Sequence, residues 1–171
     1  VDSTALPEQV IDAVVQSAFR SAGQRCSALR VLCVHESIAD GVIEMIQGAM
    51  AELSVGNPRA LATDVGPLID AEARANVQRA IERLQREAKF IAQTPAQTGG
   101  NFIAPIAFEI AQLAQVKEEI FGPVLQVLRW RGEVDALVDQ INALGYGLTL
   151  GVQTRIDSRA ERIARRAKVG N

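Results

Sequence analysis

The sequence predicts an α/β protein with a three-layer αβα architecture, in which helices cover both faces of a mostly parallel, doubly wound sheet. Apolar positions with helical spacing alternate along the chain with short, partly β-branched runs, the order that a parallel sheet requires. Aromatic residues make up only 4% of the chain, so the core must consist mainly of aliphatic side chains, as in buried parallel sheets. A length of 171 residues fits one domain of this kind.

Five helices are expected from apolar residues that recur every three or four positions. The first should cover residues 8–20 and end at Gly23. The second should cover residues 38–53, and a third should begin with Asp70 as its cap. A fourth is marked by the apolar positions between 134 and 144. Asp157 should cap the last helix.

The strands are expected from compact apolar runs between these helices. Residues 28–35 form such a run, which we expect to be a strand buried on both faces. The other predicted strands are 90–93, 102–106, 124–130 and 148–154, with a polar loop over 94–101. Ligands of doubly wound sheets bind beyond the carboxyl ends of strands, so the site is expected there. No Gly-x-Gly-x-x-Gly or P-loop pattern is present, so most of any nucleotide site should lie outside this segment.

Composition excludes several classes of protein. The formal charge is −2 with both signs mixed, which argues against a nucleic-acid or membrane surface. No apolar run approaches the ~20 residues of a membrane helix, and the first residues do not resemble a signal peptide. Two cysteines, Cys26 and Cys33, are too few for a disulfide scaffold, so we expect a cytoplasmic protein. One histidine and no Cys-x-x-Cys argue against a zinc site. The two ends have the appearance of cuts in a longer chain.

Cys26 is the first candidate for chemistry. It lies between the first predicted helix and the first predicted strand, where flanking elements would fix its backbone while its thiol faces a cleft. The alternative is that Cys26 is a small packing residue, because free cysteine is among the most buried residue types. For Ser27, a role in substrate binding competes with a hydroxyl that bonds the local backbone. Arg30 could pair with an upstream carboxylate or cover the sheet edge.

A second candidate lies almost a hundred residues downstream. Glu118 and Glu119 are followed by Phe121 and a Gly-Pro turn that leads into the strand 124–130. A carboxylate here could accept hydrogen bonds from a sugar diol, with the aromatic ring packing against a flat ligand ring. The alternative is a charged surface turn with Phe121 tucked beneath it.

These motifs together resemble the aldehyde dehydrogenase superfamily. The resemblance rests on Gly23-Gln24-Arg25-Cys26, on Glu118-Glu119-Ile120-Phe121-Gly122-Pro123-Val124, on the loops 56–58 and 66–69, and on residues 142–148, and it covers essentially the whole chain. More narrowly, residues 21–33 and 141–152 resemble the L-glutamate-γ-semialdehyde (Δ1-pyrroline-5-carboxylate) dehydrogenase module of the bifunctional proline utilization A family.

This resemblance implies an NAD-dependent aldehyde dehydrogenase of proline catabolism, with Cys26 as nucleophile and Ser27 helping to hold the substrate carboxylate. Glu119 would contact the nicotinamide ribose, and Phe121 would pack near the nicotinamide ring. Residues 1–171 would then be part of the catalytic domain. The dinucleotide-binding domain, the general base and the substrate-anchoring loop would lie outside the chain. FAD would belong to an attached proline dehydrogenase domain, and the full-length protein would form a homo-oligomer.

Two alternatives remain open at this point. The protein could be an aldehyde dehydrogenase for a different aldehyde, or a non-catalytic α/β module retained for assembly or ligand sensing. In each case we expect the isolated segment to be inactive and to have no measurable affinity for NAD.

Overall fold

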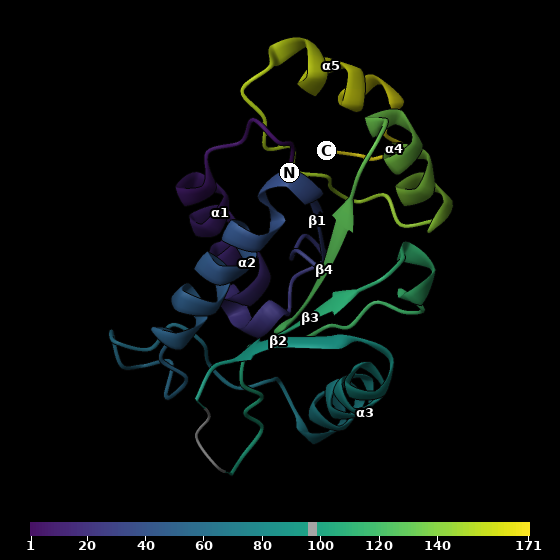
Figure 1. Ribbon diagram of the computed structural model, residues 1–171. Helices are drawn as coiled ribbons and strands as arrows, with labels where there is room; N and C mark the ends of the chain where they lie inside the picture. The colour runs from purple at the N-terminus through teal and green to yellow at the C-terminus, as the bar shows by residue number, and fades with distance from the viewer. Residues whose placement is uncertain (96–98) are drawn as a thin grey trace.

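The computed structural model describes residues 1–95 and 99–171, which form a four-stranded sheet with helices on both faces (Figure 1). The strand order is β1-β4-β3-β2; β4 is parallel to both β1 and β3, and β2 is antiparallel to β3. The strands are β1 (Val31–His35), β2 (Lys89–Gln93), β3 (Ile106–Ile110) and β4 (Val124–Trp130). The predicted α/β class and mostly parallel sheet are therefore confirmed.

All five predicted helices are present. They are α1 (Pro7–Phe19), α2 (Glu36–Ala51), α3 (Ala71–Glu87), α4 (Val134–Ala143) and α5 (Asp157–Arg166), with two 3₁₀ turns, η1 (Arg20–Gly23) and η2 (Leu113–Gln115). Asp70 caps α3 as predicted, because its Oδ1 accepts a hydrogen bond of 2.7 Å from the backbone N–H of Ala73. The prediction for Asp157 is wrong: Ile156 occupies the N-cap position, and Asp157 is the first residue of α5.

Three strand predictions differ from the structure. Residues 102–106 are not a strand; β3 begins only at Ile106, directly after Pro105, which has no N–H to donate to a ladder. The segment 148–154 is also not a strand, since it runs beside no partner strand of the described residues and makes isolated hydrogen bonds, such as Leu150 N–H to Asn171 O. Of the predicted loop 94–101, residues 96–98 lie outside the described part of the chain.

The first strand is shorter and less buried than predicted. Residues 28–30 precede β1, because the chain turns at Ala28 and the N–H of Leu29 donates to α1 at Ser17 O. Within β1, Leu32 and Val34 are buried, whereas Val31, Cys33 and His35 are only partly buried. One face of β1 therefore packs into the core and the other lines a groove.

The core lies on both sides of β3 and β4. Helices α1 and α2 pack against each other on one face of the sheet, and α3 lies on the other (Figure 1). The central strand β4 is buried over nearly its whole length, which fixes its amino end as a rigid support. Helices α4 and α5 pack together beyond the carboxyl end of β4 (Figure 1). Among the described residues, no helix is both long enough and apolar enough to cross a bilayer.

Candidate active site

The two motifs meet at the amino ends of β1 and β4. Cys26 lies in a turn before β1, which we call the Cys26 turn (residues 24–28). Glu119 and Phe121 lie in the segment before β4, which we call the Glu119 loop (residues 117–123). Because β1 and β4 are parallel neighbours, the loops that precede them lie at the same end of the sheet, beside the amino ends of both strands. The expectation of a site at the carboxyl ends is therefore wrong for these residues.

An unusual backbone leads into the Cys26 turn. Helix α1 ends at Phe19, and the next turn contains Ser21, Ala22 and Gly23 with φ angles of 54°, 53° and 66°. Left-handed conformations in non-glycine residues are strained and persist only where the surroundings enforce them. Here Ala22 is 1% exposed, so packing holds the turn in place.

The Cys26 turn and the Glu119 loop touch through two glycines. A Cβ atom on Gly23 would lie 2.2 Å from the carbonyl oxygen of Gly122, so only glycine allows this approach. On the other side, a Cβ on Gly122 would lie 2.6 Å from a methyl carbon of Val77 in α3. The two loops are thus stacked, backbone against backbone, on α3.

Cys26 and Ser27 are both exposed. They line a groove of roughly 510 Å³ together with Glu119, one face of β1, and part of α4. The backbone N–H of Cys26 donates to no acceptor among residues 1–95 and 99–171, and the Ser27 hydroxyl likewise has no hydrogen-bond partner there. The exposure of Cys26 argues against a packing role, and the local-backbone role considered for Ser27 is not observed.

Arg30 connects the two motifs. Its Nη2 lies 3.2 Å from Glu119 Oε1, and its guanidinium carbon lies 5.0 Å from the centroid of the Phe121 ring. Of the two roles considered for Arg30, pairing with an upstream carboxylate is not observed within the described residues, where its ion pair is with Glu119, downstream in the chain. The sequence offered one signal for this role: an arginine just before an apolar strand must find partners for its charge.

Gln24 was given no role of its own in the sequence-based prediction, although it belongs to the Gly23-Gln24-Arg25-Cys26 motif. Its Oε1 accepts a hydrogen bond of 2.9 Å from the N–H of Ile69, and its Nε2 lies 3.4 Å from the carbonyl oxygen of Pro67. Gln24 therefore ties the loop 66–69 to the Cys26 turn. Together with Glu119 and Phe121, it borders a second hollow of roughly 470 Å³ against α3. Glu119 lies where the two hollows adjoin, because it borders both.

Cys33 and His35 have structural surroundings. Burial raises the pKa of the Cys33 thiol to about 11, so this thiol stays protonated at neutral pH. His35 accepts a hydrogen bond from the N–H of Ser37 at the start of α2, and its ring packs edge-on against Trp130 with centroids 4.7 Å apart. Within the described ranges, no group of three or more His, Cys, Asp or Glu residues is arranged to hold a metal ion.

Comparison with known proteins decides the family. The aldehyde dehydrogenase family matches residues 1–171, the whole chain. The chain belongs to this family. The bifunctional protein PutA of Klebsiella aerogenes is 49% identical over 100% of the chain, which covers 14% of PutA. The 1-pyrroline-5-carboxylate dehydrogenase of Bacillus subtilis is 34% identical over 100% of the chain and is covered to 34%.

Solved structures of aldehyde dehydrogenases have the same fold. Proline utilization A of Bradyrhizobium japonicum superposes with a TM-score of 0.97 at 52% identity, over 100% of this chain and 18% of that protein. The chain thus spans about a seventh of the length of the PutA proteins it matches. The resemblance inferred from Cys26, Glu119 and Phe121 is confirmed at the level of the family, whereas the roles of these residues remain predictions.

Proposed function

We propose that this chain is the cysteine-bearing part of the catalytic domain of an NAD-dependent aldehyde dehydrogenase. The full-length protein would oxidise L-glutamate-γ-semialdehyde to L-glutamate, the second step of proline catabolism. The observation that supports this most directly is the exposed Cys26 thiol in one groove with the Glu119 carboxylate. The names of the relatives, bifunctional PutA and 1-pyrroline-5-carboxylate dehydrogenase, support the substrate.

In this proposal, Cys26 supplies the nucleophile. Its thiolate attacks the aldehyde carbon and forms a thiohemiacetal. This adduct would lose a hydride to NAD and a proton to give a thioester, which water would hydrolyse to release the acid. The N–H of Cys26, which has no acceptor among the described residues, can donate to the oxygen that becomes negative when the carbon is attacked. Ser27, exposed beside Cys26, would donate a hydrogen bond from its hydroxyl to the substrate carboxylate.

The chain's own residues fit an NAD site at its edge. Arg30 holds only Oε1 of Glu119, and Oε2 makes no hydrogen bond within residues 1–95 and 99–171, so it is available to accept from ribose hydroxyls. Phe121 is 45% exposed and can pack against a flat ring. When bound, NAD supplies the hydride acceptor for the oxidation. Most of its site would lie in a dinucleotide-binding domain outside this segment.

The test uses the full-length protein with two matched cysteine variants. Cys26→Ala should abolish NADH formation from L-glutamate-γ-semialdehyde, whereas Cys33→Ala, in the neighbouring strand, should retain it. Turnover in Cys26→Ala contradicts the assigned nucleophile. Faster oxidation of simple alkyl aldehydes than of the semialdehyde by the wild-type protein contradicts the proposed substrate. A wild-type protein with no activity on any aldehyde would favour the non-catalytic module.

A further inference from the structure

We propose that Arg30 is a positioning residue, which fixes the Glu119 loop against the Cys26 turn so that the carboxylate and the thiol keep one relative placement. This inference rests on the proposed function, and it adds a residue to the machinery of that reaction.

Arg30 binds the main chain of both segments. On the Cys26 side, Nη1 donates to Gly23 O at 2.6 Å and Nη2 donates to Arg25 O at 2.9 Å. On the other side, Nη1 also makes a long contact of 3.5 Å with Gly122 O. Since main-chain carbonyls cannot change rotamer, these bonds fix loop backbones rather than mobile side chains.

The same guanidinium orients both side chains that the proposed function assigns to the cofactor. It holds Oε1 of Glu119 at 3.2 Å and lies over the Phe121 ring. Arginine suits this task because its planar fork offers several donors in fixed directions and its face stacks on aromatic rings. Lysine offers a single charged atom and cannot make the same set of contacts.

Arg30 itself is held firmly. Its side chain is only 15% exposed, and its backbone carbonyl accepts a hydrogen bond of 3.0 Å from Gln126 N–H in β4. Burial lowers the pKa of its guanidinium, and the hydrogen bond and charge of Glu119 oppose that shift. A partly buried cation with carbonyl and carboxylate partners therefore links the Cys26 turn to the Glu119 loop.

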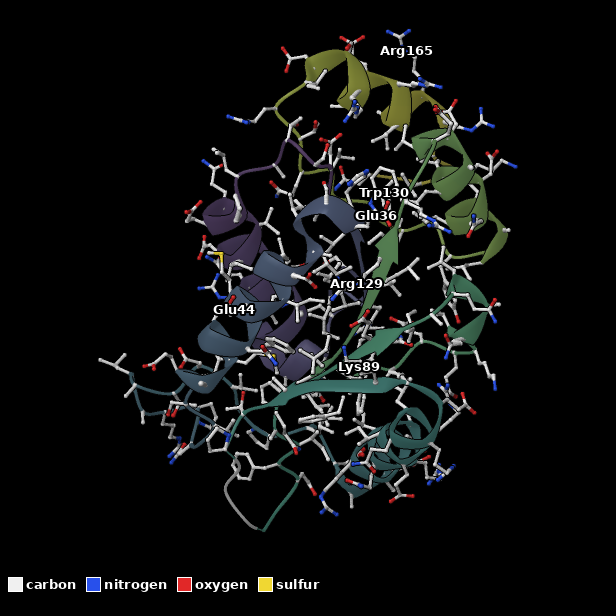
Figure 2. The ribbon with its side chains drawn as sticks, in the orientation of Figure 1. Glu36, Glu44, Lys89, Arg129, Trp130 and Arg165 are labelled. Atoms are coloured by element: carbon white, nitrogen blue, oxygen red, sulfur yellow. The ribbon has the colours of Figure 1, made fainter. Side chains whose placement is uncertain are left out.

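The experiment compares Arg30→Lys with Arg129→Lys in the full-length protein. Arg129 lies on β4 (Figure 2) and makes two ion pairs, with Glu109 at 2.7 Å and Asp40 at 2.6 Å, away from the site. Arg129→Lys is therefore a matched control, because it also replaces a partly buried arginine that pairs with carboxylates. Two quantities are measured: the dissociation constant of NADH by fluorescence, and the rate at which iodoacetamide alkylates Cys26, by mass spectrometry.

We expect Arg30→Lys to raise the NADH dissociation constant by about fivefold or more, because it weakens a charge-assisted bond to Glu119. It should also change the rate of alkylation of Cys26 by about threefold or more, because the turn loses a bond at the neighbouring carbonyl. Arg129→Lys should change each quantity by less than about twofold. A folded Arg30→Lys protein with both quantities unchanged overturns the inference, even if its melting temperature falls.

Glu119→Gln tests the contact between Arg30 and Glu119 by changing the carboxylate instead of the arginine. It should change the rate of alkylation of Cys26, because the two segments are coupled through Arg30. Adding Arg30→Lys to it should raise the NADH dissociation constant little further. If Arg30→Lys does not fold, an unchanged alkylation rate in Glu119→Gln overturns the inference. If the wild-type protein binds no NADH, the proposed function fails, whereas alkylation of Cys26 still tests Arg30 without any cofactor.

Discussion

Gly23→Ala should be strongly destabilising, although it adds only one methyl group. The new Cβ would lie 2.2 Å from the carbonyl oxygen of Gly122, and the backbone at Gly23 has a φ of +66°. A left-handed conformation costs an alanine about 1–2 kcal/mol, and forcing extra atoms into a packed region costs about 1–3 kcal/mol more. We therefore expect the free energy of unfolding to fall by about 2–5 kcal/mol.

Two other glycines give a graded comparison for the same substitution. Gly48 lies in α2 with no atom within 4 Å of its added Cβ, so Gly48→Ala should raise the unfolding free energy by about 0.5–1 kcal/mol. Gly122→Ala collides with Val77 at 2.6 Å but carries no left-handed penalty, so its cost should be about 1–3 kcal/mol. Shortening the neighbour in the double variant Gly122→Ala/Val77→Ala should recover part of that loss.

Urea unfolding, followed by the fluorescence of Trp130, the chain's single tryptophan, measures all four variants. The expected order of stability is Gly48→Ala above wild type, then Gly122→Ala, then Gly23→Ala. The reasoning is refuted if Gly23→Ala unfolds within about 0.5 kcal/mol of wild type, the scatter of ordinary surface substitutions. In the full-length protein, Gly23→Ala should also lower the dehydrogenase activity, because the Cys26 turn is pushed away from the Glu119 loop.

Further predictions concern the two thiols, a helix cap and the α4–α5 pair. In the native protein iodoacetamide should label Cys26 quickly and Cys33 slowly from pH 7 to 9, because burial raises the pKa of Cys33 to about 11; mass spectrometry showing equal labelling of both contradicts the assignment. Asp70→Ala should lower the unfolding free energy by about 1 kcal/mol while Asp70→Asn preserves it, as urea titration can check, and equal losses would argue against a side-chain cap. The hydrogen bond from Arg166 lowers the pKa of Asp139, so its stabilisation of α5 is present above the ordinary value of 3.8 and is lost as the pH falls through the lowered value. The protection factors of the α5 amides, taken relative to intrinsic exchange at each pH, should fall on such acidification, and Asp139→Asn should show the lower protection already at pH 7.

The helices and the central strand could be predicted because each satisfies a local rule. The apolar spacing of α1 to α5 and the mostly apolar run of β4 both indicate burial directly. The misplaced strands depend on partners that lie far away in the sequence. Residues 102–106 and 148–154 look like strands on their own, but a strand exists only where a neighbour completes its ladder.

The candidate site was predictable in its residues but not in its geometry. Cys26, Glu119 and Phe121 stand out as unusual residue types in unusual places. Their location at the amino ends of the strands was missed, because the usual rule for parallel sheets favours the carboxyl ends. Arg30 was named without its true partner, since an ion pair across 89 positions leaves no periodic pattern in the sequence.

The stacking of Gly23 on Gly122 has a consequence for how this scaffold can be altered. Alignment of thiol and carboxylate depends on main-chain contacts, whereas the groove beside them is walled by replaceable side chains such as Tyr146 and Leu148, both about half exposed. Under the proposed function, libraries aimed at new aldehydes would vary those walls and keep the glycine pair. Substitution of Gly23 or Gly122 would lower the turnover of every substrate, because it would displace the Cys26 turn from the Glu119 loop.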